Sequence, residues 1–294
     1  MNIRATILSV LIVISLATMC GPHLNKGDDG DTEAGNIPRG PYLGQTPPGE
    51  TPRLFAPGII STGLHDDGSP IFSPDLKEVY FRKFAYPHDI IGYMKQVEGK
   101  WSEPTLFKPA GEHVVLTPVF IPGTHKAVFT SRMPVPGKPE AAGFNPWIAE
   151  KSASGWSEFQ YAGSLAPEGK YYIATSAGPD STLYFHADLD AGLGGYDIYY
   201  SEYRDGHYQA LVNLGAPVNT RNMERGPCIS PDGTYLLYCA NGDEDNLGGF
   251  DLYVAFKKND GSWTRGYNLG EGINTADTEK FPAISPDGKY FFFV

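Results

Sequence analysis

A turn that recurs every 48 to 57 residues constrains the fold of this chain more than any other feature. Ser-Pro-Asp stands at residues 73–75, and Ser-Pro-Asp-Gly stands at 230–233 and 285–288, each time between two apolar runs. Proline presets φ at the second position of a turn, and Asp and Gly suit the positions after it. Each motif therefore predicts a hairpin between two strands. With weaker copies, the turn prolines fall at 74, 122, 179, 231 and 286.

Two further markers share this period but are offset from the turn. The first is an aromatic residue that heads a short strand, at Trp101, Trp156, Tyr208 and Trp263. The second is a Gly-aromatic-Asp box before another strand, at 195–199 and 249–253, with weaker versions at 144–148 and 91–94. Four short antiparallel strands in each repeat of about 50 residues are typical of a propeller blade. The 35 Gly, 25 Pro, 18 Tyr and 16 Phe suit the many turns and half-buried strands of such a fold.

The two ends of the repeat region complement each other. Residues 52–57 match residues 104–109 and supply a spare fourth strand, whereas residues 282–294 supply only a first and a second strand. We predict an all-β propeller of four-stranded antiparallel blades, with five repeats counted and six blades as the alternative. The N-terminal strand is expected to close the last blade, as propellers do to remove sheet edges. That blade would still lack its third strand, and Phe291–Val294 would form an exposed apolar edge, so we expect the last blade to be incomplete.

The first residues predict export. Arg4 precedes an apolar run from Ala5 to Met19 that is too short for a membrane span and suits a signal peptide over residues 1–19. Leu16–Cys20 resembles the bacterial lipoprotein box, in which the cysteine becomes lipidated, and cleavage after Ala17 is the alternative. Residues 20–49 are rich in Gly, Asp and Pro and predict a flexible tether, which leaves 50–294 for the propeller.

Taken together, the Ser-Pro-Asp-Gly turns, the Gly-Gly-aromatic-Asp boxes and the Trp-headed strands resemble the WD-like repeat of bacterial TolB-type propellers. This resemblance covers about residues 50–294. It implies a protein of the bacterial envelope, often a lipoprotein, that binds partners rather than catalysing a reaction. TolB itself has six blades and an additional N-terminal domain for which this chain has no room, so its own partners are not carried over.

Charge and motifs narrow the function further. The chain has 23 Lys and Arg against 34 Asp and Glu, a net charge of −11, which argues against a nucleic-acid partner. It lacks a Gly-x-Ser-x-Gly elbow, a His-Glu-x-x-His motif and a phosphate-binding loop. The Ser-Pro-Asp-Gly turns differ from sialidase Asp boxes in the position of glycine, so we interpret them as structural.

Candidate binding residues fall on one face of the predicted propeller. That face carries the loops that enter each first strand and those that join second to third strands, and loops on a rigid scaffold commonly carry function. Aligning the repeats gives two rim positions and two loop clusters. The first rim position holds His65, His113, Lys170, Asn222 and Asp277; the second holds Asp67, Val115, Tyr172, Glu224 and Glu279; the loops add Asp188, Asp190, Asp243, Glu244 and Asp245. We predict a largely acidic pore mouth that binds a cation, a cationic peptide or a sugar; the alternative is solvated loop residues and strand caps.

Metal ligation is a sharper hypothesis for part of this set. His65, His113, Asp277 and Glu279 combine imidazole and carboxylate, but they come from different repeats without short-range ligand spacing. We therefore predict neither a metal nor a cofactor.

Other conspicuous residues have simpler interpretations. Asp197 and Asp251 follow Gly-Gly at strand starts and are expected to accept backbone N–H bonds. The tryptophans are expected to pack within blades. Cys228 and Cys239 lie on the two strands of one hairpin, where an oxidising envelope would permit a disulfide, although sequence does not fix their register.

The leading functional hypothesis is a non-catalytic propeller of the cell envelope that binds a protein or peptide. Its location would be the periplasm or the outer membrane, with the N-terminal lipid as the only membrane contact. Two alternatives remain: a structural envelope lipoprotein, and a carbohydrate-active lyase or glycosidase. The enzyme would use His65 or His113 with Glu224, Glu279 or Asp277, and would need these groups to converge in one pocket.

Overall fold

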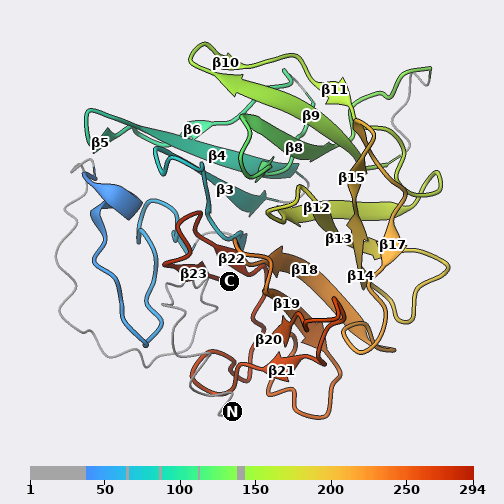
Figure 1. Ribbon diagram of the computed structural model, residues 1–294. Coiled ribbons are helices and arrows are strands. Elements are labelled where there is room, and N and C mark those ends of the chain that lie inside the picture. The colour runs from blue at the N-terminus through green and yellow to red at the C-terminus, as the bar shows by residue number, and fades with distance from the viewer. Residues whose placement is uncertain (1–37, 64–65, 86–87, 112, 138–142) are drawn as a thin grey trace.

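The computed structural model describes residues 38–63, 66–85, 88–111, 113–137 and 143–294. Antiparallel sheets are arranged around a common axis as a β-propeller, which confirms the predicted fold class (Figure 1). The only helical element in these ranges is one 3-10 turn, η1 (Pro41–Gly44). No helix in them is both long and apolar enough to cross a bilayer.

Four sheets of four or more strands follow each other along the described part of the chain, and we call them blades 1 to 4; two further sheets are two-stranded hairpins. Blade 1 contains β1 (Asp66–Asp67), β2 (Ile71–Phe72), β3 (Glu78–Ala85), β4 (His88–Val97), β5 (Lys100–Trp101) and β6 (Thr105–Leu106). Blade 2 contains β7 (Val119–Phe120), β8 (Lys126–Ser131), β9 (Asn145–Ser152), β10 (Gly155–Trp156) and β11 (Gln160–Tyr161). Blade 3 contains β12 (Tyr171–Ala177), β13 (Leu183–Asp188), β14 (Asp197–Ser201) and β17 (Val212–Asn213), with a small hairpin of β15 (Tyr203–Arg204) and β16 (His207–Tyr208). Blade 4 contains β18 (Met223–Ile229), β19 (Tyr235–Asn241), β20 (Asp251–Phe256) and β21 (Tyr267–Asn268), and the C-terminal hairpin pairs β22 (Ala283–Ile284) with β23 (Phe291–Phe292).

The repeated turns are structural, as predicted. In all three Ser-Pro-Asp turns the serine hydroxyl donates to the aspartate two residues later, at 2.6 to 2.8 Å. The same serine oxygen accepts the backbone N–H five residues on, at 2.9 to 3.1 Å. Trp101, Tyr208 and Trp263 are buried and Trp156 is half-buried, which confirms that these aromatic residues pack within the blades.

Glycine permits close contact between neighbouring blades at the Gly-aromatic-Asp box. The backbone N–H of Gly249 donates to the carbonyl of Asp277 at 2.6 Å, and the N–H of Glu279 donates to the carbonyl of Phe250 at 2.7 Å. A Cβ atom at Gly248 would lie 2.1 Å from the Asp277 carbonyl oxygen, so only glycine fits there. The box of blade 3 makes the equivalent contacts with blade 4, which explains why both boxes begin with Gly-Gly.

The N-terminal segment meets the C-terminal hairpin through side chains. Residues 52–57 form no strand; instead the Phe55 ring packs on Phe292 at a centroid distance of 5.0 Å. Tyr42, which we predicted to lie in the tether, is buried and donates to Asp287 at 2.6 Å. The packed part of the chain therefore includes residues N-terminal to position 50, and side-chain packing takes the place of the predicted closing strand.

The C-terminal phenylalanines do not form the expected exposed edge. Phe291, Phe292 and Phe293 are each only 1% exposed. Phe291 and Phe293 pack against blade 4, whereas Phe292 packs against blade 1 and the N-terminal segment. Lys280 and Val294 exchange two backbone hydrogen bonds, at 2.7 and 2.9 Å, which extends the hairpin ladder. Alternation along the strand thus buries both faces of the hairpin.

Candidate functional site

The two box aspartates cap their own loops, as predicted. Asp251 is fully buried and accepts hydrogen bonds from the backbone N–H groups of Leu247 and Gly248, at 2.7 and 3.2 Å, and from the Asn268 amide at 2.7 Å. Asp197 in blade 3 accepts the three equivalent bonds. Both carboxylates are satisfied by the fold itself.

The two rim glutamates have the same kind of role. Glu224 accepts hydrogen bonds from the backbone and the hydroxyl of Thr220, at 3.1 and 2.6 Å, and Glu279 accepts the same pair from Thr275 at 3.0 and 2.6 Å. Burial raises the pKa of Glu224 to about 7 despite these bonds, and it also raises the pKa of Glu279. Each carboxylate is held within its own loop, and the two do not converge.

The remaining predicted residues are spread over the loops. Tyr172 is buried and its hydroxyl donates to Asn145 at 3.2 Å, while Val115 lies in the core of blade 2. Lys170 pairs with Asp190, Asn222 donates to Asp243 at 2.9 Å, and Asp245 accepts from Tyr253 at 2.8 Å. His113, Asp188, Glu244 and Asp277 are exposed. His65 and the side chain of Asp67 lie outside the described residues, as does Cys20. These contacts favour the interpretation as strand caps and solvated loop residues.

No group of three or more potential metal ligands occurs among the residues that the structure describes. The cysteines form no bridge either: Cys228 and Cys239 are buried free thiols. A register shift places Cys228 opposite Leu237 and Cys239 opposite Arg225, so the two cysteines do not face each other. Burial raises their pKa values, to about 12 and about 11.

A cavity of about 140 Å³ lies on the propeller axis. Its walls come from the first strands of all four blades and the residues that lead into them, from the second strands β3 and β13, and from the C-terminal hairpin. They include Gly68, Ser69, Ile71, Leu116, Thr117, Pro118, Val119, Tyr171, Ile173, Ala174, Thr175, Gly226, Phe281, Pro282 and Ala283. Arg82, His186 and Arg225 are the cationic or titratable nitrogen groups in the wall.

Strand alternation explains why these residues differ from the predicted ones. Successive side chains of a strand point to opposite faces. Tyr172 and Glu224 therefore point into the spaces between blades, whereas Tyr171 and Arg225, one residue away, line the axial cavity. At these two positions the predicted residue and the cavity-lining residue are one position apart in the chain.

One level of the axial channel is rich in basic groups. Five cross-strand pairs, one from each repeat, stand at this equivalent position, and the first three pairs and Arg225 contribute residues to the cavity wall: Gly68 with Arg82, Leu116 with Thr130, Ile173 with His186, Arg225 with Cys239, and Lys280 with Val294. They contain two arginines, a lysine and an imidazole, and no acidic side chain. The local charge is thus opposite in sign to the net charge of the chain, −11.

The cationic groups of the cavity differ in their partners. Arg82 forms a salt bridge with Asp89 at 2.5 Å. Arg225 has no carboxylate within 4.0 Å among the described residues; its guanidinium carbon lies 4.7 Å from the centre of the Tyr196 ring, and its Nε is buried without a hydrogen-bond partner. His186 is 3% exposed, and neither of its ring nitrogens has a partner. Burial, together with the charges of Arg225 and Arg82, lowers its pKa to about 3 and keeps the ring neutral.

Arginine and aromatic side chains form a continuous chain beside the cavity, which we call the arginine–aromatic belt. It runs through Arg132, Phe144, Tyr171, Tyr196 and Arg225. The guanidinium carbon of Arg132 lies 4.4 Å from the Phe144 ring centre, and the successive aromatic centroids are 5.7 and 5.6 Å apart. The belt joins blades 2, 3 and 4 on the loop-rich face and packs against His186.

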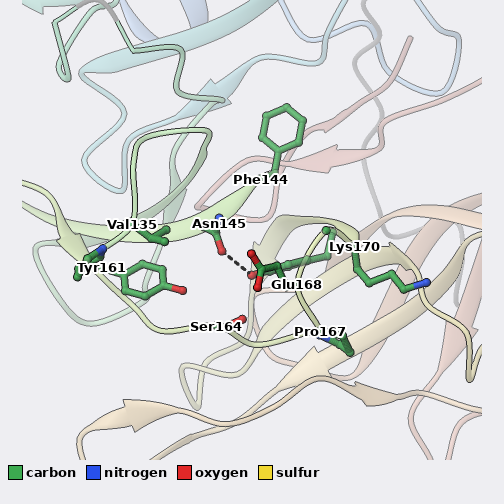
Figure 2. A pocket seen from close by; sticks show the side chains of 11 residues that line it. Val135, Phe144, Asn145, Tyr161, Ser164, Pro167, Glu168 and Lys170 are labelled. Carbon is green, nitrogen blue, oxygen red and sulfur yellow. Dashed lines mark hydrogen bonds between the residues drawn. The ribbon is translucent and has the colours of Figure 1, made fainter. Parts of the chain in front are cut away.

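A second cavity of about 190 Å³ lies between blades 2 and 3, with Phe144 of the belt in its wall. Figure 2 shows Asn145, Tyr161, Ser164 and Glu168 around it, and the Lys170 side chain directed away from the hydrogen bond at Asn145. Phe144 and Tyr172 line this cavity, whereas Tyr171, whose ring contacts that of Phe144, lines the axial one.

Comparisons with known proteins concern the fold. No protein-family model and no curated protein matches the chain. Among solved structures it is similar to TolB from Acinetobacter baumannii, with a TM-score of 0.46, 18% identity, and coverage of 78% of this chain and 48% of that one. It is also similar to an α-L-arabinofuranosidase from Lactobacillus brevis, with a TM-score of 0.47, 11% identity, and coverage of 76% of this chain and 80% of that one. A thermostable family-43 glycoside hydrolase is similar with a TM-score of 0.46, 14% identity, and coverage of 78% of this chain and 83% of that one. The chain spans about half the length of the TolB structure that it matches.

Proposed function

We propose that this protein is a non-catalytic propeller of the bacterial cell envelope that docks a protein or peptide on its loop-rich face, over the mouth of the axial cavity. The observation that carries this proposal is the arginine–aromatic belt beside a cavity with unpartnered donors. Aromatic and arginine side chains are the residue types that dominate protein interfaces. The predicted signal peptide and the lipoprotein-like box at Cys20 support the location in the periplasm or at the outer membrane.

The positions of the acidic groups support binding over hydrolysis. A glycosidase needs two carboxyl groups that flank one bond. Glu224 and Glu279 are each occupied by a threonine of their own loop, and Asp277 is exposed. Among the described residues, the acids named for the enzyme hypothesis therefore offer no convergent pair.

Site-specific photo-crosslinking in cells tests this proposal. A photoreactive residue replaces Leu193, which lies on the loop-rich face and is 54% exposed. The matched control replaces Val97, which lies in a turn on the opposite face and is 57% exposed. We expect a discrete crosslinked species from position 193 and none from position 97. Equal crosslinking from both faces, or none from a correctly folded protein, would contradict the proposed docking face.

A further inference from the structure

The axial cavity holds donors that the fold leaves without acceptors. The ring of His186 is almost completely buried, and both of its nitrogens lack hydrogen-bond partners. The Nε of Arg225 is in the same state. Native proteins pair nearly all buried polar atoms, so two such groups in one cavity wall need an explanation. A ligand that accepts hydrogen bonds supplies one.

The positive charge in the cavity wall favours a ligand with one negative charge. Asp89 already neutralises Arg82, and His186 is neutral, so Arg225 provides one uncompensated positive charge. Lys280, next to the cavity-lining Phe281, also has no acidic partner among the described residues. A single anionic group satisfies Arg225 without leaving a second negative charge in a partly apolar cavity.

The volume of the cavity and its apolar wall indicate the size and polarity of the remaining part of the ligand. The volume of about 140 Å³ is close to that of an engineered cavity that accepts benzene. Apolar side chains, among them Ile71, Leu116, Val119 and Ala283, form much of the wall. The ligand therefore combines an anionic end with an apolar portion about the size of one aromatic ring.

We propose that the axial cavity binds one carboxylate group attached to a small apolar body. Arg225 pairs with the carboxylate, His186 and Tyr171 stand beside it as hydrogen-bond donors, and the apolar wall holds the body. A carboxylate fits because its two oxygens match the fork of a guanidinium and because it carries a single charge at neutral pH. Arg82, held by Asp89, borders the same cavity.

This inference rests on the proposed docking function, because the carboxylate would belong either to the docked partner or to a free small acid. The two sources share one chemistry. A residue at the end of a peptide presents a carboxylate next to an apolar side chain, and a free aromatic acid presents the same two groups.

Calorimetric titration of the mature protein with sodium benzoate tests the site. We expect benzoate to bind at least tenfold more tightly than benzamide, its neutral counterpart, and more tightly than phenyl phosphate, its doubly charged counterpart. Arg225→Met should weaken benzoate binding at least tenfold. Arg265→Met is the matched control, because Arg265 lies over the Tyr267 ring at 5.7 Å on an exposed part of blade 4, and it should leave the affinity unchanged.

Two further variants keep the test decisive if Arg225→Met folds poorly. Arg225→Lys retains the charge and should bind benzoate with intermediate affinity, and His186→Leu should weaken it without changing the charge of the wall. Equal binding of benzoate and benzamide, full affinity in both Arg225 variants, or no benzoate binding by the wild type would overturn the proposal.

Calorimetric titration with two more compounds, N-acetylphenylalanine and its amide, distinguishes the two sources of the carboxylate. If N-acetylphenylalanine binds more tightly than benzoate and its amide does not bind, the carboxylate comes from the end of a peptide. If benzoate binds more tightly than N-acetylphenylalanine, the carboxylate comes from a free acid. Both results support the carboxylate site. Benzoate binding without crosslinks from position 193 would refute only the docking function, and crosslinks without benzoate binding would refute only the carboxylate site.

Discussion

Two polar regions on the same face of the propeller differ in how completely the fold satisfies them. In the box loops, Asp197, Asp251, Glu224 and Glu279 are buried and every one has partners from its own blade. In the axial cavity, Arg225 and His186 keep buried donor atoms without acceptors. The first region contributes to stability, since leaving a buried polar atom unpaired is costly. The second resembles a site whose remaining partner comes from outside the chain.

The largest effect is expected from removing a box carboxylate. Asp251→Ala deletes three hydrogen bonds and leaves two buried backbone N–H groups unpaired, which should lower the free energy of unfolding by about 3–5 kcal/mol. Urea unfolding measures the change. Asp260→Ala, on an exposed turn, is the control and should leave the midpoint almost unchanged. Similar midpoints for the two variants would contradict the capping role.

The second-largest loss of stability is expected from replacing Gly248, the first glycine of the same box. Gly248→Ala places a Cβ atom 2.1 Å from the Asp277 carbonyl oxygen, so blade 4 and the segment that leads into the C-terminal hairpin must separate, at a cost of about 2–4 kcal/mol. Gly272→Ala is the matched control, because a Cβ atom there meets no atom within 4 Å. Equal thermal stability of the two variants would show that the junction tolerates a side chain.

The pH dependence of stability should identify the buried glutamate. The pKa of Glu224 rises from 4.5 in a free side chain to about 7 in the folded state. Between these values the folded state binds more protons than the unfolded state, so stability falls as pH rises, by about 1–3 kcal/mol from this residue. Glu224→Gln should remove most of this pH dependence. The rest should persist in that variant, because burial also raises the pKa of Glu279. An unchanged slope in Glu224→Gln would refute the assignment.

The smallest stability change is expected in the cavity, and its sign is the informative part. Arg225→Met removes a guanidinium that lacks an acidic partner and adds apolar contact, so stability should stay the same or rise by about 1 kcal/mol. Thermal unfolding without any ligand measures it. A loss as large as that of Asp251→Ala would mean that Arg225 is a structural residue like the box acids.

Much of the fold could be predicted from local sequence. Turn chemistry is local, so Ser-Pro-Asp located three of the hairpins, and the Gly-Gly before Asp251 marked the start of a strand. The closure of the ring could not be predicted, because it depends on Tyr42 and Phe55 meeting residues more than 200 positions away. The cysteine register was hidden for a similar reason, since a bulge between Arg225 and Cys228 shifts the pairing.

The residues predicted for the site are neighbours in sequence of residues that line the axial cavity. The prediction concentrated on acidic residues of the loops, whereas Glu224 and Glu279 cap their own loops. Arg225 stands next to the predicted Glu224, and Tyr171 next to the predicted Tyr172. Writing out the cross-strand pairs at one level would have brought Arg82, His186 and Arg225 together, because hairpin register is what places residues of second strands in the channel.

The most direct test of the difference between the two regions is an NMR titration of the histidine ring nitrogens with benzoate. The ring resonances of His186, identified by their absence in His186→Leu, should shift in step with the calorimetric binding curve, while those of the exposed His113 and His207 stay in place. Resonances of His186 that remain unchanged while benzoate binds would contradict the account, because the ligand would then lie outside the axial cavity.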